Sequence, residues 1–149
     1  MKYLIALILL IAPTVSFAYE PTQTHAGLTE QVVEFYNTNA DKKITNSQKE
    51  LIIQGAMDED DPTTRAVNHF YDPIRNIGIE GGRTAKDWAL GDLVTNDFSW
   101  KKAIDAYARG DMNTAFKALG HNMHLVEDMG VPDHTRNDQH LPFLSDGLG

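Results

Sequence analysis

Apolar side chains recur at intervals of three and four residues along most of the chain, which is the spacing of a buried helix face. The first such stretch is Thr29–Asn37, with Thr29 as its predicted capping residue. Further helices are predicted from the same spacing behind polar starts at Thr45, Thr84, Ser99 and Asp111. The helix behind Asp111 is predicted to be the longest. Strand-like alternation is confined to a few residues near Ile77–Ile79, so the pattern predicts an all-α helical bundle.

The N-terminal segment has a different pattern. Lys2 is followed by unbroken apolar sequence from Leu4 to Ala12, and the small residues Ser16 and Ala18 stand at the −3 and −1 positions of a cleavage site. This order is typical of a secretory signal peptide, and the apolar run is short of the roughly 20 residues that span a bilayer. We therefore expect residues 1–18 to be removed and residues 19–149 to form one secreted or periplasmic domain. An uncleaved membrane anchor is the alternative.

Composition narrows the range of partners. The chain has 13 Lys and Arg against 21 Asp and Glu, a formal net charge of −8, and no cysteine. An acidic surface repels polyanions, so binding of nucleic acid through the phosphate backbone is not expected. Without disulfides, packing or a bound metal must stabilise the fold.

Four of the six histidines, namely His121, His124, His134 and His140, lie in the last thirty residues. His124 and Asp128 are four residues apart on a predicted helix, so both side chains leave the same face and can bind one ion. His121 lies on the same side, and we expect it to be a core residue or to act behind the ligands. The segment around Pro132 turns His134 back towards this helix end. Together these residues indicate a metal site.

A second candidate cluster lies upstream. The acidic run Asp58–Asp61 follows an apolar helix face, and His69 comes shortly after it. Carboxylates at the C-terminal end of a helix are electrostatically unfavourable unless a cation compensates them. For Asp58 and Asp61 we expect a solvated helix end.

The order of these motifs resembles a known family. His25 is followed by Gly-Ala-x-x-x-Asp ending at Asp60, by His-Phe-Tyr-Asp-Pro from His69, and by Leu-Gly-x-x-x-His-x-x-x-Asp-x-x-x-Pro-x-His over Leu119–His134. This order is similar to that of the zinc-dependent phospholipases C of bacteria, which are fold relatives of the single-strand-specific nucleases. The resemblance runs from His25 to about His140.

The resemblance implies a cluster of two to three zinc ions. Asp60, His69 and His124 would bind one ion, and Asp128 would bridge it to a second ion that His25 also binds. Asp60 and Asp128 would be the catalytic carboxylates.

His134 and His140 would belong to a third ion. In the family a Glu four residues after the last His completes that site, whereas this sequence has Leu144 there. The family also uses a free N-terminus as a ligand, and Tyr19 stands only six residues before His25. We therefore expect the sequence to be part of a longer protein, truncated at its C-terminal end.

The predicted function is that of an exported zinc-dependent phosphoesterase acting on phospholipid, with peripheral membrane contact left open. One alternative is a nuclease or nucleotidase of the same fold, which would need aromatic side chains to stack a base. The candidates for that role are Tyr71, Trp88, Phe98 and Trp100. The other alternative is a zinc-binding structural domain without turnover.

Overall fold

The computed structural model describes residues 21–91 and 96–138, and these residues form helices and connecting loops with one isolated bridge between Asp72 and Ile77. In chain order the elements are α1 (Pro21–Asn39), α2 (Asn46–Asp58), the 3₁₀ helix η1 (Thr63–Asn68), α3 (Ala85–Leu90), α4 (Trp100–Ala108), α5 (Met112–Asp128) and α6 (Pro132–Arg136). The all-α fold that the periodicity predicted is confirmed. The predicted signal peptide lies outside the described residues.

The predicted helix starts at Thr45, Thr84, Ser99 and Asp111 are correct. Each of these side chains accepts a hydrogen bond from the backbone N–H three residues further on. Such a bond satisfies one of the N–H groups that a helix start leaves without an intrahelical partner. These caps therefore set where α2, α3, α4 and α5 begin.

The predicted start of the first helix is wrong. The helix begins at Pro21, so Thr29 lies inside α1, where it is fully buried and its hydroxyl donates to Glu127 Oε1 at 2.9 Å. The first two turns of α1 are mostly polar, so the spacing of apolar residues did not indicate a helix there. At 19 residues α1 is also longer than α5, which has 17.

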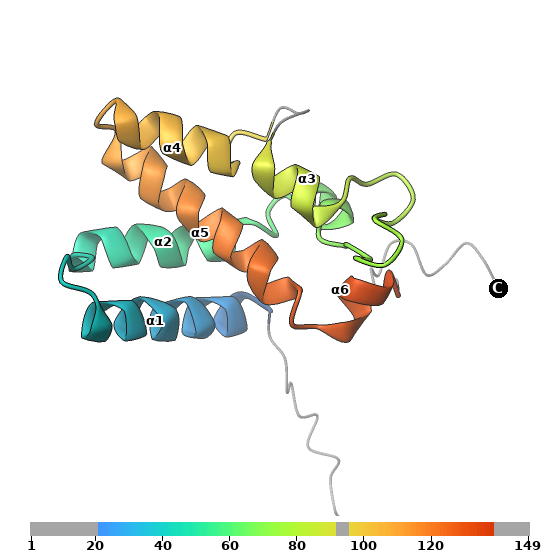
Figure 1. Ribbon diagram of the computed structural model, residues 1–149, viewed down its shortest axis with the longest axis horizontal. Coiled ribbons are helices and arrows are strands. Elements are labelled where there is room, and N and C mark those ends of the chain that lie inside the picture. The colour runs from blue at the N-terminus through green and yellow to red at the C-terminus, as the bar shows by residue number, and fades with distance from the viewer. Residues whose placement is uncertain (1–20, 92–95, 139–149) are drawn as a thin grey trace, which may run out of the picture.

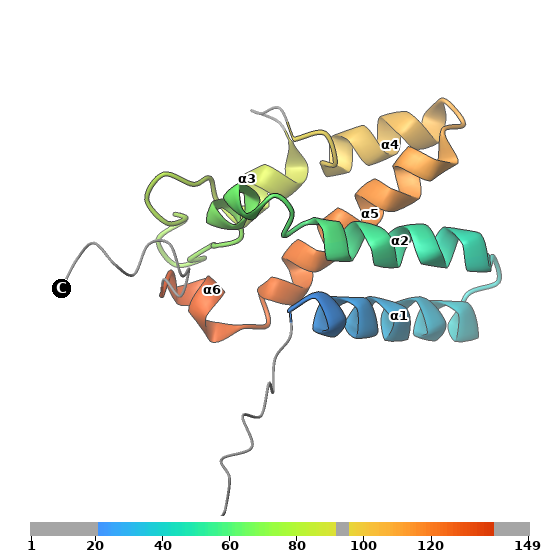
Figure 2. The same ribbon diagram turned by 180° about the vertical axis from the view of Figure 1, so that it is seen from behind.

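Helices α1 and α2 run antiparallel, and α5 crosses them (Figures 1 and 2). The most extensive helix contact joins α2 and α5, and two glycines allow it. A Cβ atom at Gly55 would overlap the carbonyl oxygen of Lys117, and one at Gly120 would overlap that of Ile52. The two helix backbones therefore touch at this crossing, which fixes the position of the C-terminal half of α5 against the end of α2.

This arrangement gathers three helix ends at one end of the bundle. The start of α1 and the ends of α2 and α5 meet there, and α6 turns back towards them (Figure 1). A small core of Phe70 and Ile79, with Ala66 and Val67 packed against it, supports the loops that follow α2. Residues from His25 to His134, distant in sequence, thus come together.

Several large apolar side chains remain exposed on α4 and α5. Trp100, Ile104 and Tyr107 of α4 are each about half exposed, and Val126 of α5 is more so. Beside them lies an apolar groove of about 750 Å³ between α1, α2 and α5. Within the described ranges, no helix combines the length and apolar content needed to cross a bilayer.

Candidate metal centre

His124 and Asp128 lie on one face of α5, as their spacing predicted. His124 Nε2 is 3.4 Å from Asp128 Oδ2. The other ring nitrogen, Nδ1, donates to the carbonyl oxygen of Ala56 at 2.7 Å. Because a carbonyl only accepts, this bond places the proton on Nδ1 and leaves the Nε2 lone pair facing the carboxylate.

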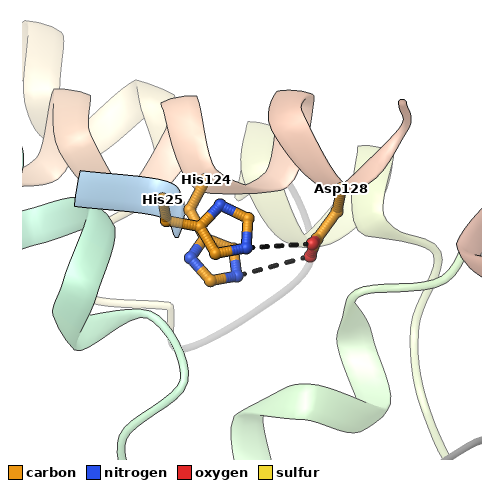
Figure 3. A group of neighbouring side chains, drawn as sticks. All are labelled: His25, His124 and Asp128. Carbon is orange, nitrogen blue, oxygen red and sulfur yellow. Dashed lines mark ion pairs between the residues drawn. The ribbon is translucent and has the colours of Figure 1, made fainter. Parts of the chain in front are cut away.

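His25 joins this pair from α1. Its ring stacks on that of His124, with 3.7 Å between ring centroids and 20° between planes. His25 Nε2 is 3.5 Å from Asp128 Oδ1. Figure 3 shows the two imidazoles side by side, both directed at the Asp128 carboxylate. The outer nitrogen, His25 Nδ1, lies 2.7 Å from Glu127 Oε2.

Asp60 and His69 approach from the segment after α2. Asp60 Oδ1 is 3.5 Å from His69 Nδ1 and 3.6 Å from His124 Nε2. His69 Nδ1 is also 3.1 Å from Asp128 Oδ2. The Asp60 side chain is 39% exposed and that of Asp128 only 3%, so Asp60 is the carboxylate of this group that solvent reaches.

His134 completes the described part of the cluster. Helix α6 turns its ring back as predicted, and its Nδ1 lies 3.5 Å from Asp128 Oδ2 and 2.9 Å from the carbonyl oxygen of His69. The ring stacks on Phe70, with 4.7 Å between centroids and 5° between planes. His140 lies outside the described residues, so the expected third ion site stays a prediction.

Two overlapping groups have the geometry of a metal site. The ligand atoms of His25, His124 and Asp128 lie within 4.8 Å of one another, and so do those of Asp60, His69 and His124. Among the described residues, buried Asp128 Oδ2 has no hydrogen bond, although three imidazole nitrogens lie within 3.5 Å of it. The Nε2 lone pair of His124 beside an Asp128 oxygen without a hydrogen bond fits a bound cation, and imidazole with carboxylate is a donor set that zinc accepts.

Protons balance the charges of this cluster when no cation is bound. Burial on its own raises the pKa of Asp128, but the imidazoles of His124 and His69 more than offset burial and hold that pKa well below its usual range. For His69 the effects are reversed. Burial on its own lowers its pKa, but the carboxylates of Asp128 and Glu59 raise it to about 9. A metal ion must displace such protons, so metal and proton compete for this cluster.

Two carboxylates behind the candidate ligands, the fully buried Glu59 and the largely buried Glu127, were missed at the sequence level. Glu127 accepts from Thr29 and contacts His25. Its only sequence signal is its place three residues after His124, which puts it on the same side of α5. Glu59, grouped in the sequence with a solvated acidic run, is fully buried and contacts His121.

The neighbours of Glu59 in the acidic run differ in exposure. Asp61 is exposed, as expected. Asp58 is only partly exposed and pairs with Lys117 at 2.7 Å, so the expectation that it is simply solvated is wrong.

The aromatic residues proposed to stack a base have other partners. Trp88 Nε1 donates to Glu59 Oε1 at 2.8 Å, and Phe98 stacks on His121. The Tyr71 hydroxyl bonds Asn76 at 3.1 Å. Trp100 is about half exposed on α4.

The chain is similar to two bacterial phospholipases C, as its motifs indicated. The phospholipase C of Listeria monocytogenes is 28% identical over 76% of this chain and 41% of its own length. The phospholipase C of Bacillus cereus is 32% identical over 51% of this chain and 25% of its own length. The chain thus spans less than half the length of either relative. No protein-family model matches it, and no solved structure does.

Proposed function

We propose that this protein is an exported zinc-dependent hydrolase of phosphodiester bonds, with phospholipid as its substrate. The observation that carries the proposal is the buried Asp128 carboxylate: among the described residues, four imidazoles lie around it and its Oδ2 has no hydrogen bond. Similarity to phospholipases C supports the reaction class. Imidazole and carboxylate together are a donor set that binds zinc.

The described residues would bind two ions, each held by a different set of ligands. His25, His124 and Asp128 would hold one ion, and Asp60, His69 and His124 another, with His134 beside them. Bound zinc supplies positive charge for the phosphate oxygens and lowers the pKa of a bound water. The Asp60 carboxylate, which solvent reaches, would take the proton of the attacking water. The phosphorus–oxygen bond to the alcohol then breaks, giving an alcohol and a phosphomonoester.

Surface properties support phospholipid over polynucleotide. The net charge of −8 disfavours a long polyanion. An apolar groove of about 410 Å³, lined by Trp100, Leu119, Met123 and Val126 among others, includes Glu127, which contacts the candidate ligand His25. Apolar surface next to the cluster suits an acyl chain rather than a ribose–phosphate backbone.

Assays with two substrates test this proposal. The zinc-loaded protein should release phosphocholine from phosphatidylcholine vesicles faster than it cleaves single-stranded DNA, and EDTA should stop the reaction. Asp60→Asn should retain zinc better than it retains activity, because the neutral amide still offers an oxygen but cannot take a proton. Preferential cleavage of DNA would support the nuclease alternative. Full zinc loading with no hydrolysis of either substrate would favour a structural metal domain.

A further inference from the structure

Two consecutive carboxylates flank one imidazole at its two nitrogens. Asp60 Oδ1 lies 3.5 Å from His69 Nδ1, on the side of the metal cluster. Glu59 Oε1 lies 3.5 Å from His69 Nε2, on the opposite edge of the ring. His69 Nε2 is buried and has no hydrogen bond among the described residues. The chain therefore presents a carboxylate to each nitrogen of His69, and only one of them reaches solvent.

The Glu59 carboxylate is paired with the guanidinium of Arg65. It is fully buried, and a buried carboxylate is costly unless it is paired and hydrogen-bonded. Arg65 of η1 supplies the charge through Nη2 to Glu59 Oε2, and its Nε donates to the Glu59 carbonyl oxygen at 3.1 Å. The guanidinium lies over the Trp88 ring at 5.0 Å, and Trp88 Nε1 donates to Glu59 Oε1.

His121 is the remaining partner of Glu59. Burial lowers the pKa of His121, so its ring is neutral and its Nδ1–H can donate to Glu59 Oε2. The ring stacks on Phe98, with 4.0 Å between centroids. His121, expected from the sequence to be a core residue or to act behind the ligands, is thus buried and contacts Glu59.

We infer that Glu59 is a positioning residue for His69: it accepts the Nε2–H of His69, so that Nδ1 is the nitrogen presented to the metal. The inference rests on the proposed metal function of the cluster. Partners from η1, α3 and α5 fix the carboxylate on one edge of the ring, and the opposite edge faces Asp60 and Asp128. A carboxylate behind a ligating imidazole fixes its tautomer and orientation and increases its basicity as a ligand.

Zinc affinity of matched variants tests the inference. Glu59→Gln and Asp58→Asn each remove one negative charge, at adjacent positions, but Asp58 pairs with Lys117 and does not contact His69. Glu59→Gln should weaken zinc binding by about 10–100-fold, as is typical when a partner behind a ligand is lost. Asp58→Asn should change it by no more than about threefold, because a partly exposed ion pair contributes little. Affinity is measured by competition with a chromophoric chelator.

The outcomes separate the two proposals. A parent protein that binds no zinc overturns the proposed function. A parent protein that binds zinc, with Glu59→Gln as tight as Asp58→Asn, overturns the role of Glu59 and leaves the metal site standing.

A spectroscopic measurement on the parent protein does not depend on whether Glu59→Gln folds. In the zinc-loaded protein, ¹⁵N–¹H correlation of the imidazole rings should show His69 protonated at Nε2 and bound to zinc through Nδ1. The reverse assignment, with the proton on Nδ1, overturns the inference. Where Glu59→Gln does fold, the His69 Nε2–H resonance should move upfield, because an amide oxygen accepts more weakly than a carboxylate.

Discussion

Asp128 lies in the middle of the candidate metal centre, with histidine side chains around its carboxylate. Imidazole nitrogens of His69, His124 and His134 lie within 3.5 Å of its Oδ2, and His25 Nε2 is 3.5 Å from its Oδ1. A carboxylate with both oxygens engaged in this way can be shared between two ions, whereas an amide has one oxygen and no charge. We therefore expect Asp128 to contribute the largest share of the cluster's affinity for cations.

Asp128→Asn should release the metal. We expect zinc affinity to fall by more than the about 10–100-fold typical of a change behind the ligands, because a ligand itself is altered. Zinc content after dialysis, determined by elemental analysis, measures the effect. Asp58→Asn, which changes a carboxylate paired with Lys117, should retain its zinc. Equal zinc content in the two variants would mean that Asp128 is not a ligand.

Glu127 gives a second prediction at this scale. It contacts His25 Nδ1 at 2.7 Å, while its other oxygen accepts from Thr29 at 2.9 Å. Glu127→Gln should weaken zinc binding about 10–100-fold by leaving His25 Nδ1 without a charged partner. Thr29→Val, which removes a donor to the same carboxylate but leaves His25 paired, should have a smaller effect. If Thr29→Val weakened zinc binding as much as Glu127→Gln, general loosening of α1 would explain both.

The candidate metal ligands could be predicted from the sequence more readily than the carboxylates that contact them from behind. His124 and Asp128 are linked by helical spacing, and His25, Asp60, His69 and His134 by the order of motifs. The partners of Glu59 and Glu127 are separated from them by up to 102 residues. Periodicity tells which face of a helix a side chain occupies but not which distant side chain meets it, so these contacts needed the three-dimensional structure.

At the scale of elements, helices with a side-chain cap were predictable, including the six-residue α3, and short helices without such a cap were not. The starts of α2 to α5 could be predicted because a cap is a local interaction within a few residues of sequence. The capping residues are Thr45, Thr84, Ser99 and Asp111. The helices η1 and α6, of six and five residues, are too short to show a repeat. Their positions depend on contacts such as that between His134 and the carbonyl oxygen of His69.

The crossing of α2 and α5 can be tested at Gly120. A methyl group there would overlap the carbonyl oxygen of Ile52, so Gly120→Ala must push the helices apart. We expect a loss of about 1–3 kcal/mol in the free energy of unfolding, as for other overpacked cores. Urea unfolding followed by circular dichroism measures it.

Gly27→Ala is the matched control for Gly120→Ala. Gly27 lies in α1, where an added Cβ has no atom within 4 Å. This change should be neutral or stabilising by up to about 1 kcal/mol, because Ala favours a helix more than Gly does. Zinc affinity should fall only in Gly120→Ala, since the same crossing brings Ala56 to His124. Equal stability of the two variants would mean that the helix contact tolerates a methyl group.

At the scale of the whole molecule, the cluster joins parts of the chain that are far apart in sequence. Its residues come from the start of α1, the segment after α2, the segment after η1, the end of α5, and α6. The chain contains no cysteine, so no disulfide links these parts. A bound ion would connect all of them, and a ligand that binds only the folded chain raises its stability by mass action.

The pH dependence of stability should therefore differ between the zinc-bound and the metal-free protein. In metal-free protein the pKa of His69 is raised from 6.5 to about 9 by Asp128 and Glu59 against the effect of burial. A group with a raised pKa contributes stability that is complete below pH 6.5 and is lost as the pH rises through about 9. The melting temperature with EDTA should then fall between pH 6.5 and 8.5.

With zinc the same protons are competitors, because His69 must lose its proton to bind metal. Zinc affinity should rise by up to about tenfold per pH unit for each proton displaced, so the gap between the zinc and EDTA melting temperatures should widen from pH 6 to 8.5. Calorimetry of both forms at several pH values measures this gap. Below pH 4 both forms should lose stability, because the depressed pKa of Asp128 makes its protonation destabilising. A gap that stays constant with pH would show that zinc binds without displacing protons, and hence not at these histidines.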